Sequence, residues 1–292
     1  MDKAFQHIAY LESNGAGKNL LALGCKAEIR LNQVENAFDK LRDFYTSNKG
    51  SWIIGFGSYD LKNGIEKLSS INIDLVKAPE LHFFVPLYLF ERKETEWKQT
   101  WGEESISIEA CFKSLNEENK LSDKQPDLIP QISFDEYQNG FKQLQRHIRL
   151  GDVYEVNYCF ELANKNVNIN SWSLYNKLNE LTKAPYSAYL KLGNIEVMCA
   201  SPERFIRKKG DVIISQPIKG TLQRGINEAD DLQLIDQLKN DPKELGENVM
   251  ITDLVRNDLS KTASRGSVEV ENLLKFKLLK LYTKWSVQLK VN

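Results

Sequence analysis

Short apolar runs separated by turns make up the first 92 or so residues and recur later in the chain. These runs are rich in β-branched and aromatic side chains, which favour strands over helices. We predict strands at 53–57, 71–75, 81–90, 153–162, 187–192, 195–200 and 212–215.

A helical pattern of apolar residues begins after Ser133. Ser133 and Glu136 have the spacing of a capping box, in which each side chain accepts a hydrogen bond from the other residue's backbone N–H. Gly151 ends the pattern. We expect this helix to bury one face, formed by Phe134, Tyr137, Phe141, Leu144 and Ile148.

Three further helices are predicted in the second half of the chain. The first is a short amphipathic helix marked by leucines at 174, 178 and 181, and the second covers Glu228–Leu238. Asp241 and Pro242 supply an N-cap and a proline at the first helical position of a third, which runs to about Leu259. Strands in series with helices of uneven length indicate an α+β protein with large antiparallel sheets flanked by helices.

The polar stretch at 113–132 has neither the strand nor the helix period, and we interpret it as a solvated connector. It divides the chain into a β-rich amino-terminal segment, residues 1–112, and a second domain, residues 133–275. Residues 276–292 are treated separately below.

Composition narrows the class of protein. The 292 residues are 41% apolar and 27% charged, the balance of a globular protein. The 40 acidic and 39 basic residues nearly cancel and form no long block, which argues against nucleic acid or a membrane as partner. No apolar run reaches the roughly 20 residues of a membrane span, and the start lacks the apolar core of a signal peptide. We therefore expect a cytoplasmic enzyme acting on a small molecule.

The cysteines and histidines are scattered along the sequence. They form no C-x-x-C pair and no cluster with the spacing of a zinc site. We expect reduced, mostly buried thiols, and catalytic acids and bases drawn from Glu, Asp and Lys. The residues concerned are Cys25, Cys111, Cys159, Cys199, His7, His82 and His147.

Glu244 and Glu247 lie three positions apart on the predicted helix after Pro242, so they share a face. Their charges repel unless a cation offsets them. Mg²⁺ would do so, taking one carboxylate directly and the other through water. The alternative is an exposed acidic turn whose charges are answered by Lys239 and Lys243.

Lys219 lies in an apolar, glycine-flanked turn directly after the strand that ends at Ser215. A lysine held in such a site can lose its proton and act as nucleophile or base, while the amides of Gly220 and Thr221 can approach an anion closely. A solvated lysine on a surface turn is the alternative.

Glu203 lies in the sequence Ser-Pro-Glu-Arg-Phe at 201–205. It could act as a general acid if burial raises its pKa. The alternative is an ion pair with Arg204 or Arg207.

Four segments, taken in order, resemble the chorismate-utilising family of anthranilate, aminodeoxychorismate and isochorismate synthases. They span about 120 residues, and residues 1–92 resemble the family more loosely, through Leu11-Glu12-Ser13 and Gly55–Asp60. The four are Gly151–Asn157, Ser201–Phe205, Pro217–Thr221 and Glu247–Leu259, the last followed by Gly266–Val270.

Within this family, a lysine before the Gly-Thr of the third segment is typical of aminodeoxychorismate synthases, whereas the other two activities usually have alanine there. The resemblance implies amination of chorismate at ring carbon 4, a step toward p-aminobenzoate and folate. It makes Lys219 the nucleophile at ring carbon 2, Glu203 the acid that assists loss of the 4-hydroxyl, Gly220 and Thr221 the residues at a substrate carboxylate, Glu247 the Mg²⁺ ligand and Glu244 its support.

The resemblance implies that ammonia, and not water, adds at ring carbon 4 once Lys219 has added at carbon 2. Isochorismate and salicylate synthases place a water-activating lysine in the first segment, where this chain has Glu155. In the family, ammonia comes from a separate glutamine amidotransferase subunit. Two alternatives stay open: anthranilate synthase component I, which shares everything except Lys219, and a non-catalytic remnant that only binds the amidotransferase.

Family members continue beyond the length of this chain, and none of their later motifs is recognisable after Leu274. One set of codons for residues 284–292, read from its third base, encodes Met-Val-Ser-Thr-Val-Lys-Ser-Lys, which resembles the segment that the family places next. We therefore expect a frameshift between about Phe276 and Leu281, an out-of-frame tail at 276–292, and no synthase activity from the polypeptide as written. The nucleotide sequence from codon 270 onward tests this.

Overall fold

The computed structural model describes residues 5–117, 126–165, 167–278 and 282–291; of residues 114, 117, 272–278 and 282–286 it describes the backbone alone. The chain forms two compact units. One comprises Met1–Glu118 with Tyr175–Asn292, and the other Asn119–Leu174. All the strand pairings in these ranges are antiparallel. The predicted α+β class, with antiparallel sheets and flanking helices, is confirmed.

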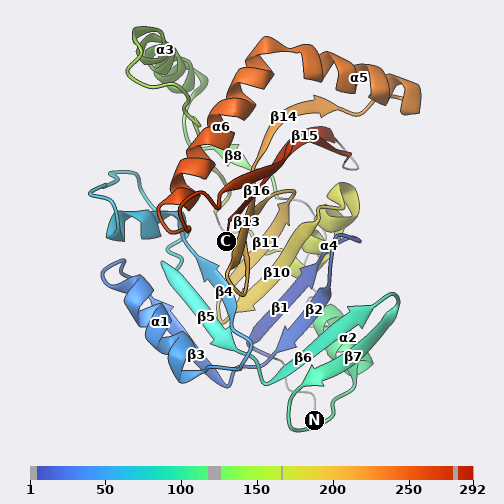
Figure 1. The fold of residues 1–292 in the computed structure, drawn as a ribbon. Helices are drawn as coiled ribbons and strands as arrows, with labels where there is room; N and C mark the ends of the chain where they lie inside the picture. The colour runs from blue at the N-terminus through green and yellow to red at the C-terminus, as the bar shows by residue number, and fades with distance from the viewer. Residues whose placement is uncertain (1–4, 118–125, 166, 279–281, 292) are drawn as a thin grey trace. The chain divides into compact units, whose positions relative to one another are not determined.

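A six-stranded sheet in the first unit has the order β11-β10-β1-β2-β6-β7 (Figure 1). Strand β1 pairs with β10, so segments from before and after the connector predicted at 113–132 share one sheet. The strands are β1 (His7–Glu12), β2 (Asn19–Leu23), β6 (Tyr88–Lys93), β7 (Glu96–Trp101), β10 (Tyr186–Leu192) and β11 (Ile195–Ser201).

A three-stranded sheet of β3 (Ala27–Leu31), β5 (Leu81–Val85) and β4 (Ile54–Gly57) shares a core with the six-stranded sheet. Phe84 and Ile54 from the smaller sheet pack with alanines and leucines of the larger one. Helix α1 (Ala37–Ser47) and the 3₁₀ helix η1 (Tyr59–Gly64) cover it with apolar side chains.

The remaining large sheet contains β12 (Arg204–Lys209), β13 (Val212–Gln216), β14 (Ile218–Gln223), β15 (Glu269–Leu278) and β16 (Tyr282–Val291). Strand β16 pairs with β13, β14 and β15. The predicted out-of-frame tail at 276–292 therefore contributes a strand to this sheet, and its genetic origin stays a prediction.

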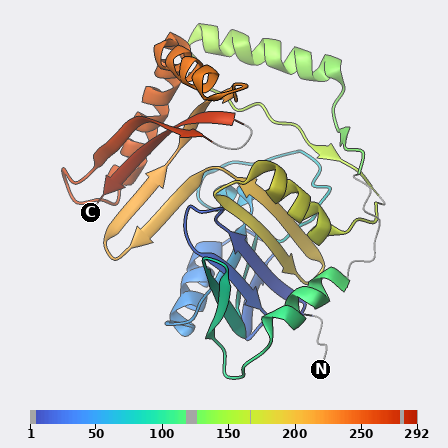
Figure 2. The ribbon, with the colours of Figure 1, turned by 90° about the vertical axis from the view of Figure 1, so that its right-hand side faces the viewer.

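Two helices follow β14, α5 (Glu228–Asn240) and α6 (Pro242–Ser260), and both were predicted. Figures 1 and 2 show α6, in orange, beside the red carboxy-terminal strands. Leu259 of α6 is buried there against Val287, Leu289 and Val291 of β16. Asp241 accepts hydrogen bonds from the N–H groups of residues 243 and 244, so the predicted N-cap is confirmed.

Helix α3 (Phe134–Leu150) in the second unit has the predicted ends but not the predicted burial. Ser133 and Glu136 form the capping box, and Gly151 ends the helix with φ 78°. Phe134 is 74% exposed and Phe141 42%, so the expectation of a buried face is wrong in this structure. The predicted leucine-marked helix is α4 (Ser171–Thr182), which spans the boundary between the units.

Two of the predicted strands are wrong. Residues 71–75 form no strand, and Ile71 and Ile73 are almost fully exposed. Within 153–162, only the last residue is in a strand, because β9 (Leu162–Ala163) pairs with β8 (Ile129–Pro130) and the rest has no strand partner. The connector predicted at 113–132 begins inside helix α2 (Ile108–Glu117), and residues 118–125 lie outside the described part of the chain. Among the described residues, no helix is long and apolar enough to cross a lipid bilayer.

Candidate active site

The Pro217–Thr221 segment begins strand β14, which is separated from β13 by Pro217 alone. The backbone of Lys219 lies opposite residue 285 of β16, and that of Thr221 opposite residue 284. Gly220 is therefore the extra residue of a β-bulge, and its φ of +66° lies in the left-handed region that favours glycine. The predicted turn is wrong: Lys219 lies in a strand, immediately before a bulge.

Gly220 also permits a close approach of the strand to the helices. A Cβ atom at this position would lie 3.0 Å from Oε2 of Glu244 and 3.5 Å from Cδ1 of Leu238. The missing side chain thus lets the backbone after Lys219 approach the carboxylate of Glu244. Two predicted parts of the site, 24 positions apart in the sequence, are adjacent in the fold.

Glu203 lies in the short link between β11 and β12 and reaches the same strand from the other direction along the chain. Its Oε1 accepts a hydrogen bond of 3.2 Å from the backbone N–H of Ile218, the residue before Lys219. Glu203 is exposed, so the burial that the general-acid hypothesis required is not present in this structure. The alternative, an ion pair of Glu203 with Arg204 or Arg207, is not observed among the described residues either. The Arg204 guanidinium donates to Gln216 and lies 5.0 Å from the Tyr186 ring centroid.

The first two turns of α6 present two carboxylates, Glu244 and Glu247, to one cation. The ammonium of Lys243 lies 3.2 Å from Glu244 and 3.2 Å from Glu247. Glu244, and to a smaller extent Glu247, raise the pKa of Lys243. One part of the alternative interpretation, a lysine that answers the acidic pair, is therefore present in the structure.

The same geometry fits a divalent cation. Both carboxylates already reach a common positive charge, and carboxylate oxygens are the ligands that Mg²⁺ prefers. The Lys243 side chain is 72% exposed, whereas those of Glu244 and Glu247 are 20% and 31% exposed. The lysine can therefore move into solvent while the carboxylates stay in place, and a Mg²⁺ ion held by Glu247 and Glu244 stays a prediction.

The structure thus gathers most of the predicted residues at the beginning of β14. The backbone N–H of Ile218, the residue before Lys219, donates a hydrogen bond to Glu203. Gly220, the residue after Lys219, faces Glu244. Lys219 and Gly220 are partly buried, whereas Thr221 is exposed.

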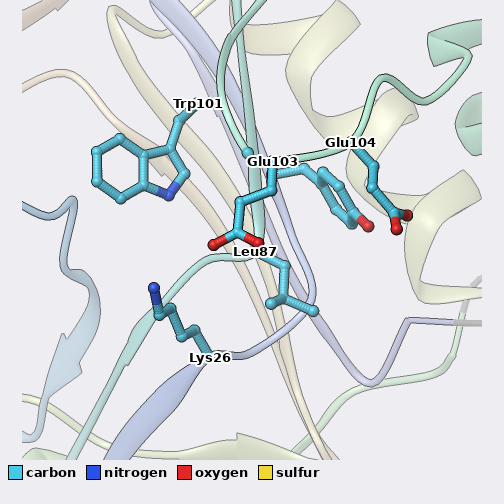
Figure 3. Close-up of a pocket in the computed structure, with 7 residues that line it drawn as sticks. Lys26, Leu87, Trp101, Glu103 and Glu104 are labelled. Atoms are coloured by element: carbon cyan, nitrogen blue, oxygen red, sulfur yellow. The ribbon is translucent and has the colours of Figure 1, made fainter.

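A pocket of about 680 Å³ lies elsewhere in the first unit, beside β6 and β7. None of the predicted site residues lines it. Figure 3 shows Lys26, Trp101 and Glu103 pointing into the same space, with Leu87 beside them. Its position separates it from the family motifs, and we place no step of the chemistry there.

Two polar clusters were missed in the sequence. Arg224, directly after β14, forms a fork of hydrogen bonds with the buried Asp231 of α5. His7 and His82, interpreted as scattered, meet at Glu28. Arg224 lies seven positions before Asp231, and this short spacing was a usable signal for their pairing. No spacing in the sequence links His7 and His82 to Glu28.

Comparison with known proteins identifies the family of this chain. The model of the family described as chorismate binding enzyme matches residues 6–281. The chain belongs to the chorismate binding enzyme family. It is 30% identical, over 77% of its length, to the anthranilate synthase component I-like protein of Synechocystis. It is 29% identical, over 76% of its length, to aminodeoxychorismate synthase component 1 of Bacillus subtilis.

A solved structure supports the fold of this chain. Anthranilate synthase component I of Streptococcus pneumoniae superimposes with a TM-score of 0.77 over 97% of this chain and 70% of that one, at 23% identity. The chain spans about half the length of the curated relatives it matches, 47% of the Synechocystis protein and 50% of the Bacillus protein.

Proposed function

We propose that this chain is the chorismate-binding part of an aminodeoxychorismate synthase component I, which exchanges the 4-hydroxyl of chorismate for an amino group. The observation that carries the proposal is the position of Lys219 in the chain. The residue before it is hydrogen-bonded to Glu203, and the residue after it faces Glu244. Relatives of that name in Bacillus subtilis and, at 38% identity over 49% of the chain, in Klebsiella aerogenes support it.

In the proposed reaction the neutral amine of Lys219 adds to ring carbon 2. The ring double bonds shift, and the 4-hydroxyl leaves as water with a proton that the family resemblance assigns to Glu203, which is exposed in the structure of this chain. Ammonia then adds at carbon 4, the double bonds shift back, and Lys219 leaves carbon 2 as the free amine. The net change is chorismate plus ammonia to aminodeoxychorismate plus water.

Positioning is the other task of these residues. We assign the backbone N–H groups of the Gly220–Thr221 segment, at the bulge, to the binding of a substrate carboxylate. Mg²⁺, when bound by Glu247 and Glu244, would neutralise the ring carboxylate and so make the ring a better acceptor for an amine. The ammonia would come from a glutamine amidotransferase subunit.

The test uses the protein that the nucleotide sequence of the gene encodes, with chorismate, Mg²⁺ and an ammonium salt. We expect aminodeoxychorismate as the product, and its loss in Lys219→Ala. Anthranilate as the product of the unmodified protein would refute the proposal.

A second candidate is anthranilate synthase component I, favoured by the name of the Synechocystis relative. A third, a remnant that only binds the amidotransferase, predicts co-purification with that subunit without any chorismate binding. The product assay and a chorismate titration together separate the three.

A further inference from the structure

Three polar side chains from three strands converge at the junction of the six-stranded and the three-stranded sheets. Nε2 of His7 lies 2.8 Å from Oε2 of Glu28, and Nε2 of His82 lies 2.9 Å from the same oxygen. The three atoms all lie within 4.8 Å of one another. None of these residues takes part in the proposed reaction with chorismate.

The fold explains why these residues meet. In the pairing of β3 with β5, Glu28 lies opposite Phe84 and Arg30 opposite His82. Glu28 and His82 are therefore diagonal neighbours on one face of the three-stranded sheet. His7 is the first residue of β1, in the six-stranded sheet, and its ring lies 5.3 Å from that of Phe84.

We propose that His7, Glu28 and His82 form a binding site for Zn²⁺ or a similar first-row transition ion. Two imidazoles and one carboxylate are a ligand set that suits zinc and not magnesium. With each ligand about 2.0–2.2 Å from the ion, tetrahedral ligand atoms lie roughly 3.3–3.6 Å apart. The two nitrogen–oxygen distances are shorter than this by about half an ångström, so a small outward movement of Glu28 admits the ion.

The exposure of the ligands favours access. Glu28 is 46% exposed, His7 12% and His82 2%. The carboxylate can therefore move, the two rings are held by the protein, and the fourth position is open to water. The site is of the open type, with three protein ligands.

The tautomers of the two histidines limit the affinity of the site for the metal ion. In the metal-free state each Nε2 can donate its hydrogen to Glu28, whereas ligation requires that hydrogen to be on Nδ1. Nδ1 of His82 is buried and has no hydrogen-bond partner among the described residues. Because missing support of this kind costs roughly 10- to 100-fold in metal affinity, we expect a micromolar and not a nanomolar dissociation constant.

A thiol ligand is disfavoured although Cys25 lies nearby. Burial, and secondarily the charge of Glu28, raise the pKa of the Cys25 thiol. The ligand atoms that converge belong to His7, Glu28 and His82, and the Cys25 sulfur is not among them. We expect a site with two nitrogen ligands and one oxygen ligand.

The experiment is calorimetric titration of the chelator-treated 292-residue chain with Zn²⁺ in a large excess of Mg²⁺. We expect one ion per chain and a loss of affinity of about 10-fold or more in His7→Gln and in Glu28→Gln, which keep a hydrogen-bonding group at each position. His147→Gln, the matched histidine control, and Cys25→Ser should bind as the unmodified protein does. Glu247→Gln should also leave zinc binding unchanged, which separates this site from the proposed Mg²⁺ site.

A measurement on the unmodified chain guards against variants that fail to fold. In nitrogen-resolved NMR spectra of the imidazoles, Zn²⁺ should shift Nε2 of two histidines and leave the third unchanged. The proposal is overturned by any of three results: no uptake of zinc at millimolar concentration, uptake that is equal in His7→Gln, Glu28→Gln and the unmodified chain, or a shift of the His147 ring in place of the other two.

Discussion

Replacing Gly220 with alanine tests the contact that joins the Lys219 strand to the α6 carboxylates. The new Cβ has two physical consequences. It forces an L-residue into the left-handed region at φ +66°, and it lies 3.0 Å from Oε2 of Glu244. The second consequence is specific to this site, because the atom it meets is the predicted support of the metal.

The two costs can be estimated separately. The left-handed conformation costs an alanine about 1–2 kcal/mol. Moving the Glu244 carboxylate away from its rotamer adds about 0.5–1.5 kcal/mol. We therefore expect Gly220→Ala to lower the free energy of unfolding by roughly 1.5–3.5 kcal/mol in total.

Gly193→Ala is the matched control. Gly193 has φ +65°, and a Cβ there would meet no atom within 4 Å. It carries the same backbone cost and the same effect of alanine on the unfolded chain, without the contact. Urea denaturation of both variants, with comparison of the m-values, measures the difference directly.

A double variant isolates the interaction with Glu244. In a Glu244→Ala background the carboxylate is gone, so Gly220→Ala should cost only what Gly193→Ala costs. The reasoning is refuted if Gly220→Ala is no more destabilising than Gly193→Ala, or if Glu244→Ala leaves the difference between them unchanged.

Three further outcomes are expected from charges and burial. The Arg224 guanidinium lowers the pKa of Asp231, so the stability this pair contributes is present above about pH 4 and is lost as the pH falls below it; Asp231→Asn should flatten that acid limb in denaturation measured at several pH values. Burial raises the pKa of Tyr175 to about 12, so the free energy of unfolding should fall as the pH rises from about 10 to 12. Tyr175→Phe should reduce the slope of that fall, and an unchanged slope would contradict the prediction. Lys243→Met removes the ammonium that both α6 glutamates share, so calorimetry should show tighter Mg²⁺ binding, and weaker binding would contradict the proposed cation position.

The sequence correctly predicted the helix ends that are determined by interactions between residues close together in the chain. The capping box at Ser133, the Gly151 end of α3 and the Asp241-Pro242 start of α6 depend on backbone groups within a few positions, and all three are present.

Elements that need a distant partner were less predictable. Residues 71–75 alternate like a strand, yet no described strand pairs with them and Ile71 is fully exposed. The run at 81–90 is two strands in different sheets, because Pro86 lacks the N–H that a continuous ladder needs. The apolar pattern of α3 correctly predicted a helix, but period alone does not supply a surface for that helix to cover.

The candidate site shows the same division. Residue type and family resemblance picked out Glu203, Lys219 and Glu244, and the fold brings their segments together at β14. The bulge at Gly220 was not predictable, because it depends on the register with β16. The meeting of His7 with His82 was not predictable either, since it requires two sheets to pack on one another.

The central claim, that Lys219 is the amine that attacks the chorismate ring, is tested most directly by trapping the adduct. The protein that the nucleotide sequence of the gene encodes is mixed with chorismate and Mg²⁺ without ammonia, then analysed by intact mass and peptide mapping. The account predicts a covalent addition of chorismate less one water on Lys219, absent in Lys219→Ala. An adduct on another residue, or aminodeoxychorismate formation by Lys219→Ala at the unmodified rate once ammonia is supplied, would contradict it.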